Sequence, residues 1–304
     1  MTEFTSLLIV LLGGALKTST PYIFVSLGEM ITEKSGRINL GLEGTLMMGA
    51  VSGFGISLLT GNPFLGILAA GLTGLFLGLL HAWLCNFPRV SSIAVGIALM
   101  IFGTGLAFYL GKPLIQPEAP HLPGFDLGFW SDNGAVREAL RVNFLFLVGV
   151  GLAPGLAWFF RSSRWGLIVR LTGENSEAAR ARGINPKTVR LLATAAGGFL
   201  AGVGGSFLSL YYPGTWTEGL SSGQGLLSVA LVIFSRWNPY ACLGTSLLFG
   251  ALGSLGAALQ AMGISQGFHL FNAAPAAFAL VLMIITSRPG RALPGRPSEL
   301  SVHT

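Results

Sequence analysis

Residues 63–85 read PFLGILAAGLTGLFLGLLHAWLC, a run without Asp, Glu, Lys or Arg. Its length is close to the ~20 residues that an α-helix needs to cross the hydrocarbon core of a bilayer. A surface helix of a soluble domain carries a polar face, whereas this segment is apolar on every side. The segment therefore predicts a membrane-spanning helix, and the same pattern extends along the chain in both directions.

Apolar segments of similar length fill most of the remaining sequence, and the charged residues fall between them. Hydrophobic residues make up 52% of the 304 residues and charged residues 10%, which is typical of a polytopic membrane protein. We expect an all-α fold with about 8–10 transmembrane helices, forming a single domain over residues 1–304. The predicted spans are 6–31, 41–60, 63–85, 90–110, 143–160, 188–211, 220–235, 239–260 and 268–287.

Two of these windows depart from a regular span. Lys17 and Pro21 divide the first window into two apolar pieces that are each about half a membrane thick, which predicts a broken or half-buried helix. The window 220–235 is short, and Gly219 and Gly223 lie at its start. Because irregular backbone at membrane depth usually lines a pathway, we expect broken or re-entrant segments here.

The positions of Lys and Arg predict the orientation. The loop 161–190 holds seven basic and two acidic residues, a balance of +5, and is predicted to be cytoplasmic together with the tail 288–304. The Pro-rich stretch 111–141 has an excess of acidic residues and is the predicted external loop. With nine crossings, the N-terminus lies outside. The net charge of +6 follows from this topology, so no nucleic-acid partner is expected.

Glycine, with 44 residues, is about twice as frequent as usual. Small residues at four-residue spacing allow helix backbones to approach closely in a membrane. We therefore predict helix-packing roles for most of them, and also for Cys85 and Cys242. The pairs with this spacing are Gly49 with Gly53, Gly198 with Gly202, Ala201 with Gly205, and Ser246 with Gly250.

A few polar residues lie at predicted membrane depth, where each is costly to keep. Asn39 and Glu43 are four residues apart and would share a helix face. One interpretation is that these groups line a solute path; the other is that they cap helix starts near an interface. The candidate path residues are Asn39, Glu43, Trp216, Glu218, Ser222 and Gln224.

The polar run GENSEAARARGINP, residues 173–186, predicts a very short helix inside the basic loop. Asn175 or Ser176 can cap its start, Glu177 favours its positive end, and Gly183 followed by Pro186 ends it. A helix of about two turns is marginal in water. We therefore expect it to be docked against a partner protein.

Catalytic chemistry is not expected. The sequence offers neither a serine nucleophile with a positioned base nor a pair of membrane carboxylates at a recognisable spacing. Lone histidines such as His81 and His269 are expected to be structural, no metal site or cofactor is predicted, and residues 13–18 lack the spacing of a phosphate loop. If transport uses ATP, the nucleotide site must lie on another polypeptide.

Three stretches resemble one family. Glu177, Ala178, Ala179 and Gly183 match the EAA-x-x-x-G core of the coupling loop in permease subunits of bacterial ABC importers. TEKSGRINLGLEGTLMMGA, residues 32–50, resembles a signature of nucleoside-importer permeases of the basic-membrane-protein type. The run 218–239, which ends in FSRWNP, resembles the run that leads to their F-G-R-W-N-P turn, with Ser235 in place of Gly. The chain thus resembles the nucleoside branch of the ribose and branched-chain amino acid permease superfamily.

The resemblance implies a type II importer-like fold. The chain would cross the bacterial inner membrane many times and would be in contact with membrane lipid. The resemblance further implies two ATPase subunits, a second and often non-identical permease, and an extracytoplasmic solute-binding protein. The implied solute is a nucleoside, and the alternative solute is a simple sugar such as ribose. The alternative classes of protein are an ion-coupled secondary transporter and a passive channel. The implied ATPase-coupling residues are Asn175, Glu177, Ala178, Ala179, Arg182 and Gly183.

Overall fold

The computed structural model describes residues 3–261, 268–286 and 295–301. Most of these residues are helical, and the one sheet among them is a hairpin of two three-residue strands. The elements are α1 (Glu3–Lys34), α2 (Leu42–Thr60), α3 (Pro63–Leu84), α4 (Ser92–Gly111), η1 (Lys112–Leu114), β1 (Gly124–Asp126), α5 (Gly134–Ala139), β2 (Arg141–Asn143), α6 (Phe144–Ser162), α7 (Arg164–Glu174), α8 (Ser176–Ala181), α9 (Pro186–Leu210), α10 (Gln224–Phe234), α11 (Pro239–Ala261), α12 (Phe268–Asn272), α13 (Ala274–Thr286) and η2 (Ser298–Ser301).

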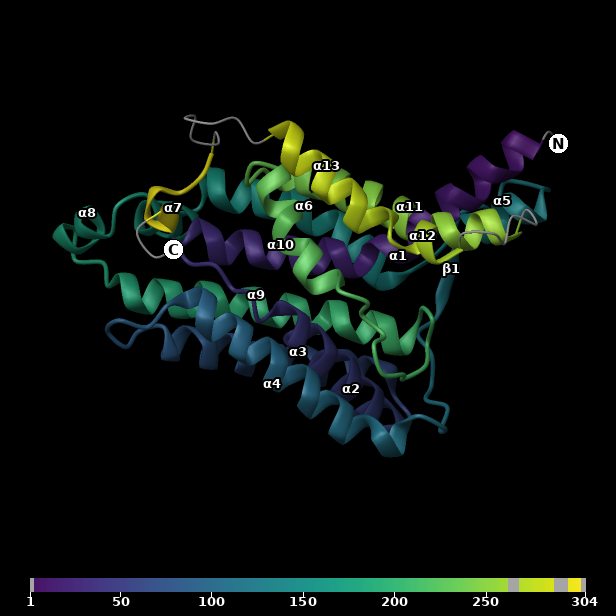
Figure 1. The fold of residues 1–304 in the computed structure, drawn as a ribbon, viewed down its shortest axis with the longest axis horizontal. Coiled ribbons are helices and arrows are strands. Elements are labelled where there is room, and N and C mark those ends of the chain that lie inside the picture. The colour runs from purple at the N-terminus through teal and green to yellow at the C-terminus, as the bar shows by residue number, and fades with distance from the viewer. Residues whose placement is uncertain (1–2, 262–267, 287–294, 302–304) are drawn as a thin grey trace.

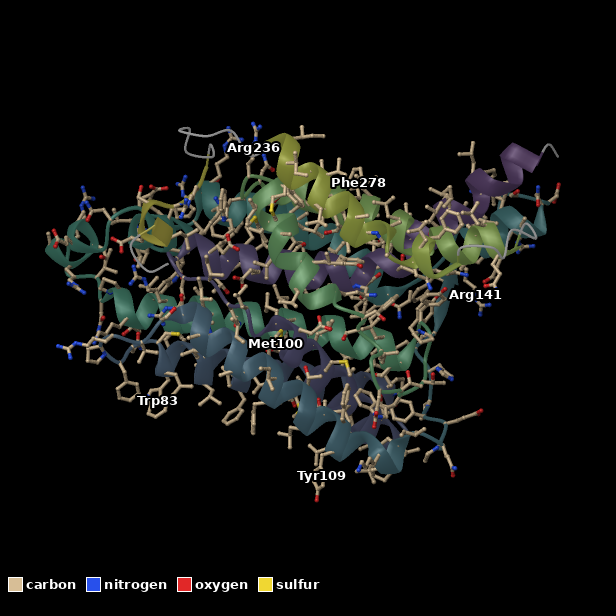
Figure 2. All side chains as sticks on the ribbon, in the orientation of Figure 1. Trp83, Met100, Tyr109, Arg141, Arg236 and Phe278 are labelled. Carbon is tan, nitrogen blue, oxygen red and sulfur yellow. The ribbon has the colours of Figure 1, made fainter. Side chains whose placement is uncertain are left out.

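The described residues contain seven helices that are long and apolar enough to cross a membrane. The shorter apolar helices α10 and α13 occupy the two remaining predicted windows. The long helices run along the longest axis of the molecule, with the N-terminus at one end and η2 of the tail at the other (Figure 1). Arg141 lies towards the end of the molecule that holds the N-terminus, and Arg236 lies nearer the other end (Figure 2). The predicted polytopic α-helical architecture is confirmed.

The prediction of a break in the first window was wrong. The helix α1 is continuous over 32 residues and contains Pro21. Neighbouring helices bury the turn around Pro21, and such packing compensates for the hydrogen bond that proline cannot make. Lys17 does not interrupt the helix either, because its Nζ lies 2.6 Å from Oε1 of Glu138 in α5. The second irregular window behaves as predicted, since α10 has only 11 residues.

The helix α9 is the centre of the bundle and packs against α1, α2 and α3. Glycine makes this possible: a Cβ on Gly74 of α3 would clash with the carbonyl oxygen of Gly198, and one on Gly205 with that of Leu46 in α2. The predicted glycine packing is therefore present. The buried His81 has a structural position, with Nε2 3.3 Å from the carbonyl oxygen of Ser92.

The predicted external loop contains the small hairpin and α5. The strands β1 and β2 pair antiparallel, with Gly124 opposite Asn143. Asp126 in β1 accepts a hydrogen bond of 3.1 Å from Nε of Arg137 in α5. These contacts gather the loop at the end of the bundle that holds the N-terminal turns of α1 (Figure 1).

Candidate solute cavity and coupling helix

The carboxylate of Glu43 holds the start of the short helix α10. Its Oε1 accepts hydrogen bonds from Ser221 Oγ and, at 3.0 Å, from the Gly223 N–H. Its Oε2 accepts the Gly225 N–H at 2.7 Å. The first N–H groups of a helix lack intrahelical partners and carry partial positive charge, so an anion here satisfies both needs. Glu43 thereby fixes α10 against the first turn of α2.

A half-open cavity of about 330 Å³ lies beside this junction. It is enclosed by α1, the segment before α10, α10 itself, α11, and the α12–α13 region. The volume falls in the range of ~300–1,000 Å³ that is usual for small-molecule sites. Its lining residues are Thr18, Tyr22, Tyr212, Ser222, Gln224, Leu227, Gly253, Ser254, Ala257, Asn272, Pro275 and Ala276. None of these described lining residues is charged.

The Thr18, Ser222 and Ser254 hydroxyls of the cavity already have protein acceptors. Thr18 Oγ1 lies 2.6 Å from the Gly250 carbonyl oxygen, and Ser254 Oγ donates to that of Ala251 at 2.9 Å. The Gln224 Oε1 atom, in contrast, is buried and has no hydrogen-bond partner among the described residues. A buried amide oxygen left in this way is costly. The Gln224 amide oxygen is therefore an unused acceptor beside the cavity.

The cavity includes two of the six candidate path residues, Ser222 and Gln224. Trp216 is fully buried in the core, where its ring packs closely on Gly111. Asn39 is also buried; its N–H donates to Glu29 Oε1 at 2.7 Å. Glu218 is exposed on the segment before α10. In this conformation these three side chains lie outside the cavity.

Sequence reasoning did not select Thr18, Tyr22, Tyr212 or Ser254. Thr18 and Tyr22 are four residues apart in α1, a helical spacing that a polar-face search could have detected. It also missed a carboxylate pair at the same spacing: Glu29 and Glu33 are both buried in α1. Glu33 Oε2 accepts a hydrogen bond of 2.5 Å from the Trp237 indole N–H, which joins α1 to the turn before α11.

The short helix α8 has well-defined ends. Asn175 Oδ1 accepts the Ala178 N–H at 2.9 Å, as the sequence suggested. At the other end the Gly183 N–H donates to the Arg180 carbonyl oxygen at 2.9 Å, and the Ile184 N–H donates to that of Ala179 at 3.0 Å. This double hydrogen bond places Gly183 in the left-handed region, with φ of 76°. Pro186 then starts α9 rather than only ending α8.

The tail of the chain ties α8 to the bundle. Glu299 Oε1 accepts hydrogen bonds of 2.8 Å from both the N–H and the hydroxyl of Ser176. Glu299 Oε2 accepts a 3.0 Å bond from Arg190 in α9, and Arg190 Nε donates to the Ser35 carbonyl oxygen at 3.1 Å. Burial acts to raise the pKa of Glu299, but the bonds from Ser176 and Arg190 lower it overall. The helix α8 is therefore connected to α1 and α9 before any partner binds.

The opposite surface of α8 faces away from the bundle. Ala179 is completely buried, whereas Glu177, Arg182 and Gly183 are exposed and Ala178 is half-buried. Figure 1 shows α8 projecting from the end of the molecule where η2 of the tail lies. Within the described part of the chain, no group of three His, Cys, Asp or Glu side chains could hold a metal ion.

A multi-pass helical bundle with a polar cavity at a short inner helix, and a protruding short helix at one end, has the architecture of a transport permease. The chain belongs to the family described as "Branched-chain amino acid transport system / permease component", whose model matches residues 11–287. It is 31% identical to a putative glucose ABC transporter permease of Haloferax volcanii, covering 84% of this chain and 79% of the relative.

Two further relatives are named for nucleosides. The nucleoside ABC transporter permease NupC of Lactococcus lactis is 31% identical, over 81% of each chain. The guanosine ABC transporter permease NupQ of Bacillus subtilis is 26% identical, over 95% of each chain. The chain is thus an ABC transporter permease, a transport subunit that crosses the cell membrane several times.

Proposed function

We propose that this permease imports nucleosides and that its α8 helix couples transport to ATP hydrolysis on a partner subunit. The observation that carries the solute assignment is the uncharged polar cavity, which combines two tyrosines with two side-chain amides. Aromatic rings suit the face of a nucleobase, and amides can both donate to and accept from base edges and ribose hydroxyls. The names of the Lactococcus and Bacillus relatives agree with this solute.

The same cavity argues against an amino acid as the solute. A zwitterion that leaves water needs oppositely charged partners for its ammonium and carboxylate groups. The lining residues that the structure describes include no Asp, Glu, Lys or Arg. The nearby Glu43 carboxylate already accepts three hydrogen bonds from Ser221, Gly223 and Gly225. A neutral solute carries no such requirement.

A simple sugar is the second candidate, because the Haloferax relative is named for glucose. A sugar would use the amides Gln224 and Asn272 in the same way as a ribose. It would gain less from Tyr22 and Tyr212, because it has no planar aromatic base to stack on them. The two candidates therefore differ in their dependence on the tyrosines.

For coupling, the exposed residues Asn175, Glu177, Arg182 and Gly183 would enter a groove on the ATPase. The half-buried Ala178 and the buried Ala179 would complete the coupling element. The connection of α8 to α1 and α9 through Glu299 and Arg190 gives a mechanical route from that groove to the spans. A second permease, an ATPase pair and an external solute-binding protein would complete the transporter. ATP can drive transport only if the two membrane states differ in their contacts with both ATPase and solute.

The test is uptake into vesicles that contain the complex purified with its native partners. Labelled uridine and guanosine should accumulate with ATP in the presence of an uncoupler, and should not accumulate with an ion gradient alone. Excess unlabelled leucine should not compete. Accumulation driven by the gradient without ATP would establish a secondary transporter. ATP-dependent accumulation of labelled glucose, without accumulation of labelled uridine or guanosine, would establish the sugar assignment.

A further inference from the structure

A second cavity, of about 430 Å³, lies at the end of the bundle that carries α8. It is formed by the turn between α3 and α4, by α8 and by the start of α9. Five of the lining residues that the structure describes are basic and none is acidic; Arg190 is paired with Glu299, so the formal balance is five minus one, or +4. The lining residues are Arg37, Cys85, Asn86, Phe87, Pro88, Arg89, Val90, Arg180, Pro186, Lys187 and Arg190.

Two of the five cations are built into the wall of the cavity. The Arg37 guanidinium donates to the carbonyl oxygens of Ala82 at 2.9 Å and Cys85 at 3.1 Å, so it is fixed on the end of α3. Arg190 donates to Ser35 and to Glu299, as described above. Both guanidinium groups therefore keep their charge in a defined place beside the cavity.

The other three cations, Arg89, Arg180 and Lys187, are exposed. None of them forms an ion pair with an acidic residue that the structure describes. Like charges gathered around one cavity repel one another unless a counter-charge binds. Arg89 also has a φ of 66°, a conformation that is uncommon outside glycine. The cavity thus presents three exposed cations and two buried ones, an arrangement that favours an anion.

One side of the cavity continues into an apolar surface. Trp83, Phe87 and Val90 are 53%, 48% and 41% exposed, and the rings of Trp83 and Phe87 meet edge to face at 5.0 Å. Figure 2 shows Trp83 pointing away from the bundle below the end of α3. The membrane spans of α3 and α4 end and begin at this turn, and tryptophan is typical of the membrane–water interface.

We propose that this cavity binds the phosphate headgroup of an anionic phospholipid, such as phosphatidylglycerol or cardiolipin, with the acyl chains lying along Trp83 and Phe87. Basic pockets between transmembrane helices are known to suit such headgroups. A free phosphate would satisfy the cations but not the apolar surface. Because Arg180 belongs to α8 and Lys187 to α9, the bound lipid joins the α3–α4 turn to the coupling region.

The experiment compares ligands on the purified complex in detergent by native mass spectrometry. The unmodified protein should retain phosphatidylglycerol at least about tenfold more strongly than phosphatidylcholine of the same chain length, and inorganic phosphate should displace it poorly. The variant R89Q/R180Q/K187Q should lose this preference. The variant R161Q/R164Q removes two exposed basic residues of the same loop that do not line the cavity, and should keep it.

Equal retention of both lipids by the unmodified protein would overturn the proposal, and this arm does not depend on the folding of any variant. Displacement by millimolar phosphate would identify a free-phosphate site instead. If the triple variant keeps the lipid preference but no longer copurifies with its ATPase, the cations serve an acidic protein surface and the lipid assignment is wrong. The single variant R89Q, which is outside α8, should weaken lipid retention while leaving ATPase recovery unchanged.

Discussion

The Oε2 atom of Glu43 lies 2.7 Å from the Gly225 nitrogen, which joins the first turn of α2 to the first turn of a helix 182 positions later. Together with the bonds from Ser221 and Gly223, this contact holds α10 in place beside the solute cavity. The stretches 32–50 and 218–239, which both resemble nucleoside-importer permeases, therefore meet at one carboxylate.

Replacing Glu43 with Gln should destabilise the protein. The amide keeps one acceptor oxygen but directs an NH₂ group at backbone donors, so at least one buried N–H loses its partner, at a cost of about 1–3 kcal/mol. The apparent melting temperature of the purified complex should fall, together with ATP-dependent uptake. Glu218→Gln is the matched control, because Glu218 is exposed and has no hydrogen bond with a described residue. Equal melting temperatures for the two variants would contradict the role of Glu43.

Substitutions of Trp216 can distinguish a role in core packing from a role in solute binding. Its side chain is fully buried with Phe54, Phe207 and Leu210, and truncation of a buried tryptophan costs about 3–5 kcal/mol. Trp216→Ala should therefore reduce the amount of assembled protein, whereas Trp216→Phe should recover both assembly and uptake. Quantifying the membrane-inserted protein beside uptake makes the distinction. Normal assembly of Trp216→Ala with lost nucleoside uptake would instead place this residue in the solute path.

The amides of the cavity should affect affinity for the solute without affecting assembly. Gln224→Ala and Asn272→Ala should each raise the KM for nucleoside uptake about tenfold, the effect of one lost hydrogen bond of ~1.4 kcal/mol. Gln260→Ala removes an exposed amide of α11 that does not line the cavity, and its KM should stay unchanged. The measurement is the concentration dependence of uptake. If Gln224→Ala and Asn272→Ala have the same KM as Gln260→Ala and the unmodified protein, this cavity does not lie on the nucleoside route.

The sequence predicted the placement of the apolar helices because hydropathy and length are local properties. It could not predict that α1 continues through Pro21, since the continuity depends on helices that pack around that turn. The same limit applies to the polar residues. Glu43 and Trp216 both stand out in the sequence, but only the fold shows that one caps α10 and the other lies in the core. The ends of α8 were predictable because Asn175 and Gly183 act within a few residues of their own positions.

The tail contact should respond to pH in a defined direction. The pKa of Glu299 is held below its ordinary value of 4.5. A carboxyl group with a lowered pKa contributes stability that is fully present above the ordinary value and is lost as the pH falls through the lowered one. Hydrogen exchange at the Ser176 amide, corrected for its intrinsic pH dependence, should therefore be protected at neutral pH and lose protection below about pH 4.5.

Glu299→Gln should remove most of this protection already at neutral pH, with exchange about tenfold faster. Ser298→Ala is the neighbouring control, because it removes the 3.1 Å hydrogen bond to Glu174 and leaves the carboxylate of Glu299 in place. Protection that stays constant between pH 7 and pH 3.5 in the unmodified protein would show that the carboxylate does not anchor α8.

Substitutions of Gly183 test most directly whether α8 couples solute transport to ATP hydrolysis. Its φ of 76° is unfavourable for a β-branched residue, although a Cβ there would meet no atom within 4 Å. Gly183→Val should therefore distort the end of α8 through backbone strain of about 1–3 kcal/mol, without a steric clash in the bundle. The protein should remain inserted in the membrane while solute-stimulated ATPase activity of the complex is lost. Gly183→Asn should retain most of that activity, because asparagine tolerates the left-handed conformation. If Gly183→Val couples as well as the unmodified protein, α8 is not the coupling element, whatever its resemblance to the EAA core.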